Sequence, residues 1–251
     1  MKSFASTPKR ADQLEQVRVL TEALDGASVK TALPYTPQIV AILRNAIVGL
    51  KLMPRTPISE AAIARVLGLS RTPVREALKD LSDQNLVDIF PQAGTVVAPI
   101  RLSLIANDNF VRHALERANL MDLAGTLTEE GKEKILKELA IQEDAIEHGR
   151  ITEFFEHDEA MHRLFFELTG RLTVWEIVQH SKQHLDRARL LLIKHDTVLC
   201  RTAYTQHVTL TNALFAGDRA KLDDALGVHL TGIRDILLQH IDSDYSDLVV
   251  E

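Results

Sequence analysis

Cysteine is almost absent from the sequence, which contains only Cys200. A single thiol cannot form an internal disulfide, so the chain carries no sign of an oxidising compartment. We expect Cys200 to be a buried, apolar-like residue rather than a nucleophile.

Long apolar runs are absent as well. None of the 251 residues lies in an uninterrupted apolar segment of the roughly 20 residues that cross a bilayer. The opening MKSFASTPKRADQLEQ lacks the apolar core of a secretory signal. These absences predict a cytoplasmic protein with no membrane partner. The hydrophobic fraction of 45% and charged fraction of 25% are those of a folded protein, and they exclude disorder throughout.

The net charge of −6 hides an asymmetry. Residues 35–100 hold seven Lys or Arg against five Asp or Glu, whereas residues 101–251 hold 17 against 26. All ten histidines follow residue 100, which points to metal or proton chemistry there. We expect a polar leader over 1–34 with at most a short frayed helix, a nucleic-acid module over 35–100, and another domain over 101–245.

The mildly basic module has the pattern of three helices and a hairpin. Apolar residues recur at helical spacing in PQIVAILRNAIVGL. A short helix, EAAIARVLGL, follows Ser59 as its cap and stops at Gly68. A third helix starts near Ser70 or Thr72, and VDIFPQAGTVVAPI reads as two strands around a turn. This order predicts a winged helix-turn-helix.

The third helix has one basic face. Arg71, Arg75 and Lys79 are spaced i, i+4 and i+8, opposite an apolar stripe. A guanidinium fork can hydrogen-bond guanine O6 and N7 together, so this face suits the major groove. Spacing alone leaves a solvated helix face as an equal alternative. If DNA is bound, Thr72 can contact a phosphate or a thymine methyl, while Arg44 and the backbone at Gly94 are expected near the DNA backbone or minor groove.

The segment from Ile42 to Val97 resembles the GntR-type winged helix-turn-helix, above all in the run LGLSRTPVREAL. The resemblance implies operator DNA as the partner. It assigns DNA contacts to Arg71, Thr72 and Arg75, supported by Arg44 and Gly94. One position departs from the family pattern, because Arg55 stands where the family usually has glycine after the proline of a turn.

Beyond Pro99 the sequence changes to amphipathic helices without a strand signal. Short breaks between them favour antiparallel neighbours. The fold class expected is therefore mainly α, with a winged helix-turn-helix followed by an all-α antiparallel bundle of about six helices. The expected helices are 104–126, 128–148, 150–168, 171–195, 199–215 and 218–240.

One helix of this bundle carries a possible ligand pair. Asp158 and His162 are four residues apart and project from one face, while His207 and His229 lie on two later helices. Three imidazoles and a carboxylate suit zinc, nickel, manganese or a similar divalent ion. Spacing does not choose between this set and a rival i, i+4 pair, His180 and His184.

Residues from about 105 to 240 are similar to the FCD domain of the FadR-type branch of GntR regulators. The matching features are VRHALE, DEAMHRLFFELTG and the spacing between the last two histidines of the set. The resemblance implies a divalent metal held by Asp158, His162, His207 and His229, with a small organic acid against it. It leaves the rival histidine pair without a role.

Arg112, within VRHALE, matches an arginine expected to pair with an effector carboxylate. An internal salt bridge with Glu116, at i+4, is an equal alternative. A second departure from the family pattern is Arg171, which stands where asparagine often follows the glycine of DEAMHRLFFELTG.

Together these features predict a homodimeric transcriptional regulator, more often a repressor within the family, controlled by a small carboxylate at the metal. Two other classes stay open at this point. In one, the four ligands activate water in an enzyme, although Glu159 points about 100° away from Asp158 and makes a poor general base. In the other, the helical domain only mediates dimerisation.

Overall fold

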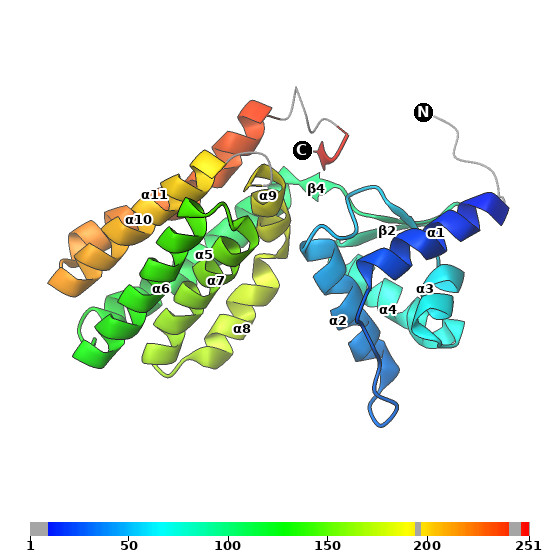
Figure 1. Cartoon of the computed structure of the whole chain (residues 1–251), viewed down its shortest axis with the longest axis horizontal. Helices are drawn as coiled ribbons and strands as arrows, with labels where there is room; N and C mark the ends of the chain where they lie inside the picture. Colours follow the sequence, from blue (N-terminus) through cyan, green and yellow to red (C-terminus); the bar gives the residue numbers. More distant parts are fainter. Residues whose placement is uncertain (1–9, 194–196, 241–246, 251) are drawn as a thin grey trace. The chain divides into compact units, whose positions relative to one another are not determined.

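The computed structural model describes residues 10–193, 197–240 and 247–250 (Figure 1). These residues form two compact units, one up to Ile100 together with residues 247–250, and one from Arg101 onward. The described residues are mainly helical, which confirms the predicted fold class. Within those ranges, none of the helices combines the length and apolar character needed to cross a membrane.

Among its described residues the first unit contains four helices and a small antiparallel sheet with strand order β1-β3-β2. The pairing of β2 with β3 is the hairpin expected from the sequence, but β1 adds a third strand along β3. Because β1 has only two residues and begins with proline, it shows no alternation of polar and apolar residues from which a strand could be predicted. The elements are α1 (Arg10–Ala23), α2 (Tyr35–Val48), β1 (Pro57–Ile58), α3 (Glu60–Leu67), α4 (Arg71–Asp83), β2 (Val87–Phe90) and β3 (Gly94–Val97). A separate pair consists of β4 (Ile100–Arg101) and β5 (Val249–Val250).

The segment before the winged helix is more than a frayed leader, which corrects the expectation for residues 1–34. It holds the 14-residue helix α1. Leu20, Ala23 and Leu24 are buried in the same core cluster as Ile39 and Leu43 of α2. These few apolar residues are hard to recognise in the sequence because most of α1 is polar. Their burial stabilises the packing of α1 against the rest of the unit.

Local signals set the helix-turn-helix. Ser59 accepts a hydrogen bond from the Ala62 amide at 3.2 Å, and Gly68 ends α3 in the left-handed region with φ 67°. Ser70 precedes α4 without a side-chain cap hydrogen bond. Arg55 has φ 66°, so the turn keeps a conformation that glycine adopts easily, at some cost in strain. Its Nε also donates to the carbonyl of Asp247 in the same unit.

The second unit contains seven helices among its described residues, one more than expected. The predicted helix 171–195 is divided at Lys182, where α8 ends and α9 begins. The cause is tertiary, because the Asp108 carboxylate accepts hydrogen bonds from the His184 and Leu185 amides at 3.1 and 3.0 Å. The helices are α5 (Leu102–Leu123), α6 (Glu129–Glu147), α7 (Ile151–Leu168), α8 (Leu172–Ser181), α9 (Gln183–Ile193), α10 (Thr197–Ala216) and α11 (Arg219–His240).

The two serines before α3 and α4 provide a matched test of capping. Ser59→Ala removes a side-chain cap and should lower the free energy of unfolding by about 1 kcal/mol. Ser70→Ala removes no such bond and should cost much less. Urea unfolding of both variants measures the difference, and equal losses would contradict the assignment of Ser59 as the cap.

Asp108 should make stability depend on pH. Burial raises the pKa of this carboxyl from 3.8 to about 7, although the amides of Leu185 and His184 oppose the shift. Between these values the folded chain holds a proton that the unfolded chain has lost, so the free energy of unfolding falls as pH rises. Asp108→Asn should remove this part of the pH dependence. Urea unfolding from pH 5 to 8 tests it, and parallel curves for variant and native protein would refute it.

Candidate metal centre and DNA-reading helix

Helix α4 separates a core face from an exposed polar face, as its periodicity predicts. Val74, Leu78 and Leu81 are buried. Much of the remaining helix surface is exposed. It carries the three predicted DNA contacts and the third residue of the basic face, namely Arg71, Thr72, Arg75 and Lys79. The helix therefore offers polar side chains in its first turn, where a recognition helix meets base edges.

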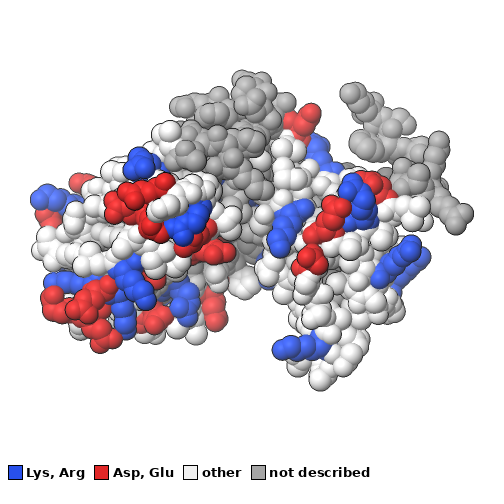
Figure 2. Space-filling model, in the orientation of Figure 1, with Lys and Arg blue, Asp and Glu red and all other residues white. Residues whose placement is uncertain are grey.

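Arg75 and the two supporting positions, Arg44 and Gly94, differ in how strongly neighbouring groups hold them. Arg75 is 71% exposed and forms a bidentate pair with Glu60, at 2.8 and 2.9 Å. Arg44 is half-buried and donates to Gln84 Oε1 at 3.1 and 2.9 Å. Gly94 begins β3 with φ 113° and is exposed. On the face of the molecule drawn in Figure 2, basic and acidic side chains are intermixed.

Two exposed apolar side chains near the turn between β2 and β3 were not singled out by the sequence. Ile89 is 45% exposed and Phe90 is 51% exposed. The segment VDIF reads equally well as an ordinary strand, and Ile89 has the same phase as the buried Val87, so only the structure identifies the exposed apolar residues next to the turn.

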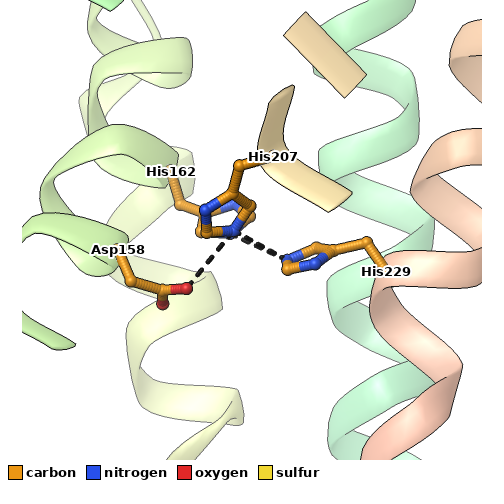
Figure 3. A group of neighbouring side chains, drawn as sticks. All are labelled: Asp158, His162, His207 and His229. Carbon is orange, nitrogen blue, oxygen red and sulfur yellow. Dashed lines mark hydrogen bonds and ion pairs between the residues drawn. The ribbon is translucent and has the colours of Figure 1, made fainter. Parts of the chain in front are cut away.

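In the helical unit, the four predicted ligands come together in the core. Asp158 and His162 lie on α7, His207 on α10 and His229 on α11, and all four are buried (Figure 3). Their candidate ligand atoms lie within 4.8 Å of one another. His229 Nε2 is 3.2 Å from His162 Nε2 and 3.3 Å from His207 Nε2. His207 Nε2 is also 3.3 Å from Asp158 Oδ1.

The second nitrogen of each histidine faces an oxygen acceptor. His207 Nδ1 is 2.7 Å from Gln142 Oε1, and His229 Nδ1 is 3.1 Å from Gln206 Oε1. His162 Nδ1 is 2.8 Å from Glu116 Oε2. These partners favour a proton on each Nδ1 and leave the Nε2 lone pairs facing the cluster. Metal-binding histidines are held in the same way.

Asp158 is oriented by a buried arginine. Arg189 of α9 contacts its Oδ2 at 2.7 Å, while Oδ1 has no hydrogen-bond partner and is directed toward His207. The side chains of Arg189 and Asp158 are 4% and 0% exposed. An oxygen without a hydrogen bond in a buried site is the atom that a cation would satisfy. Three nitrogens and this oxygen are a donor set suited to zinc, nickel or manganese.

Burial and neighbouring charges hold these groups in the protonation states that metal ligands need. Burial lowers the pKa of His207 to about 3, although Asp158 opposes the shift. Burial, with the neighbouring His207 and His162, lowers the pKa of His229 well below its usual value. Burial alone would raise the pKa of Asp158, but Arg189 and the histidines bring it well below 3.8. The imidazoles of His207 and His229 are thus neutral, and the carboxylate of Asp158 is ionised.

Arg112 forms the internal salt bridge with Glu116 and also contacts His162, a neighbour that the sequence did not suggest. Its Nε donates to Glu116 Oε1 at 2.5 Å, as the salt-bridge alternative requires. Its Nη2 also lies 2.9 Å from His162 Nε2, so the guanidinium reaches the cluster of four candidate ligands. Burial would raise the pKa of Glu116, but Arg112 and His162 lower it to about 2.

The structure also separates the ligand set from other candidates. His180 is exposed on α8, and His184 is buried on α9; neither belongs to the described cluster. Cys200 is buried, as expected. Arg171 contacts Asp122 at 2.7 Å, away from the four ligands.

Sequence reasoning missed three residues that support the cluster, Gln142, Gln206 and Arg189. The two glutamines lie on different helices, α6 and α10, and no periodicity relates them. Arg189 had a faint signal, because Lys182, Asp186 and Arg189 follow one another at i, i+4 and i+7. Such a charged stripe normally lies in solvent, whereas all three of these residues are buried.

Comparison with known proteins agrees with both units. Residues 36–97 match the model for bacterial regulatory proteins of the gntR family, and residues 110–232 match the FCD domain. The HTH-type transcriptional repressor RspR of Escherichia coli K12 is 32% identical over 209 residues, covering 82% of this chain and 90% of that protein. An HTH-type transcriptional regulator of Streptomyces ambofaciens is 34% identical over 197 residues, covering 77% of this chain and 80% of that protein.

Solved structures show the same fold. E. coli McbR/YncC superimposes with a TM-score of 0.67 at 20% identity, covering 83% of this chain and 99% of that chain. A GntR regulator from Rhodococcus also gives a TM-score of 0.67 at 20% identity, over 82% of this chain. From the matches of both segments and the identity with curated regulators, the chain belongs to the GntR family of bacterial transcriptional regulators with an FCD domain, and it is a DNA-binding regulator rather than an enzyme.

Proposed function

We propose that this regulator is a homodimeric repressor, acting in the cytoplasm, whose affinity for operator DNA is controlled by a small organic acid bound at a divalent metal. The observation that carries the proposal is the convergence of three histidine Nε2 atoms and Asp158 Oδ1 in the core. A cluster without a ligand would gain little from three buried imidazoles whose lone pairs face one another.

The metal would be held by Asp158, His162, His207 and His229, and it would act as a Lewis acid toward an oxygen ligand. The surrounding charges favour an anion as that ligand. Two buried arginines, Arg112 and Arg189, balance the two carboxylates Glu116 and Asp158, so these four groups sum to zero. A divalent cation then leaves a buried positive excess, which a carboxylate would reduce.

On the DNA side, Arg71, Thr72 and Arg75 are the proposed base or phosphate contacts, with Arg44 and Gly94 beside them. GntR regulators bind operator DNA and are typically dimeric. A dimer places two recognition helices in successive major grooves, about 34 Å apart. The acid would act by its differential affinity for arrangements of the dimer that fit the operator well or poorly. In this proposal residues 35–100 read DNA and residues 101–245 sense the acid and dimerise.

Substitutions on α4 should separate base reading from phosphate contact. With an operator selected by the native protein from random duplexes, Arg71→Ala should weaken specific binding on the order of ten- to a hundredfold and relax sequence preference. Lys79→Ala should weaken binding to all sequences and lower the salt dependence by about one counterion. Fluorescence anisotropy at several salt concentrations measures both effects.

Arg18→Ala is the matched control for that experiment, because Arg18 lies on α1 and pairs with Glu15 and Glu22 on the surface. It should bind DNA as the native protein does. If Arg71→Ala lowered specific and random binding equally, base reading by Arg71 would be wrong.

Metal binding should raise thermal stability through the four ligands. After chelator treatment, added Zn²⁺ or Ni²⁺ at about 100 times its Kd should stabilise the native protein by about 2.7 kcal/mol. In His207→Ala this increment should disappear, whereas His180→Ala, which changes an exposed histidine outside the cluster, should keep it. Differential scanning fluorimetry gives the increment for each variant relative to its own metal-free form.

The same assay with a panel of small carboxylic acids tests the effector. An acid that stabilises the protein only when the metal is present, and then changes operator affinity, supports sensing. Equal metal increments in the native protein and His207→Ala would show that the four residues do not form the site, and the helical domain would then be a dimerisation unit.

A further inference from the structure

Arg112 contacts the nitrogen that His162 would use as a metal ligand. A guanidinium has only donors, so at 2.9 Å the lone pair of His162 Nε2 accepts from Nη2 of Arg112. The other ring nitrogen, Nδ1, faces Glu116 Oε2 at 2.8 Å. In this arrangement Nδ1 lies at ion-pair distance from Glu116 and Nε2 accepts from Arg112, so Nε2 becomes available to a metal only when Arg112 moves away.

Glu116 keeps Arg112 in this position. One carboxylate oxygen accepts from Arg112 Nε, and the other faces Nδ1 of His162, so a single buried carboxylate holds both partners. Their side chains are almost fully buried, at 3% for Arg112 and 1% for Glu116. Water therefore solvates the guanidinium very little at this position. If Arg112 moves away from His162, its Nη2 needs another hydrogen-bond acceptor.

The second buried arginine of the cluster behaves differently. Arg189 contacts Oδ2 of Asp158 and leaves Oδ1 directed toward the histidines. It thus orients a ligand without covering the ligand atom. Of these two arginines, Arg112 alone is hydrogen-bonded to an atom through which the metal would be bound.

We propose that Arg112 blocks the metal-facing nitrogen of His162 until a carboxylate ligand draws the guanidinium away, so that metal and acid bind cooperatively. The inference rests on the metal site of the proposed function and adds the residue that couples its two ligands. A carboxylate beside the metal can accept both N–H groups of the fork, which replaces the bond lost at His162. By linkage, the acid strengthens metal binding by the same factor as the metal strengthens acid binding.

The test is the Zn²⁺ affinity of the full-length protein, measured by competition with a chromophoric chelator, with and without saturating acetate at constant ionic strength. Acetate presents one carboxylate and competes weakly for zinc. In the native protein acetate should tighten the Zn²⁺ Kd by about tenfold, within the usual range of coupling factors. R112M should bind Zn²⁺ more tightly than the native protein without acetate, and acetate should change its Kd by less than about twofold.

A second variant keeps the test informative if R112M does not fold. R112M leaves Glu116 as a buried charge without its arginine, which can destabilise the core. R112M/E116Q removes both charges and keeps an amide oxygen for Nδ1 of His162. R163M is the matched control, because Arg163 is adjacent to His162 in sequence but is 51% exposed and pairs with Glu167. Circular dichroism checks that each variant is folded.

Three results would overturn the proposal. They are a Zn²⁺ affinity that is unchanged or weaker in both Arg112 variants, a native Kd that acetate does not change, and an acetate effect of native size in both variants. Failure of the proposed metal site is a separate result, in which His207→Ala binds Zn²⁺ as tightly as the native protein.

Discussion

The helical unit depends on a constraint of imidazole chemistry. A neutral imidazole has one N–H and one lone pair, so three histidines can direct lone pairs at a common point only if each N–H has an acceptor elsewhere. Glu116, Gln142 and Gln206 supply those acceptors from α5, α6 and α10. Without them, buried N–H groups would face one another in the dry core, where each lost hydrogen bond is costly. The packing of helices around α7 therefore also sets the tautomers of the cluster.

The same constraint explains why α9 carries so many buried charges. Arg189 reaches Asp158, and Lys182 at the start of α9 contacts Glu159 and Asp186 at 2.6 Å each. Burying such groups is tolerated only when each has a partner of opposite charge. The break before α9 allows this placement, since Asp108 satisfies its first amides and frees the helix from the direction of α8. The capping of α9 and the orientation of Asp158, a proposed metal ligand, are thus parts of one arrangement.

The sequence was sufficient wherever a property is local or periodic. Helical spacing predicted α4 and its exposed basic face, and the i, i+4 relation placed Asp158 and His162 together. The assignment of His207 and His229 needed the family resemblance, because spacing could not exclude the rival pair of histidines. The break at Lys182 and the glutamine acceptors could not be predicted, since each depends on a residue from a helix distant in sequence. The packing of α1 could not be predicted for a similar reason, because its few apolar residues form part of a core only together with α2.

The DNA contacts proposed for the first unit would follow an opposite constraint, because a side chain that binds DNA would first have to leave its partner within the protein. Arg75 is held by Glu60 in the described structure, and this exposed pair contributes little to stability. In the proposed contact with a base, Arg75 would have to leave Glu60, whose carboxylate would then stand near the negatively charged DNA backbone. Random DNA gives the arginine only a phosphate in return, whereas guanine accepts both N–H groups of the fork. A weakly basic module with an internal competitor would therefore gain specificity at the expense of general affinity, and the proposed homodimer would restore affinity by doubling the contacts.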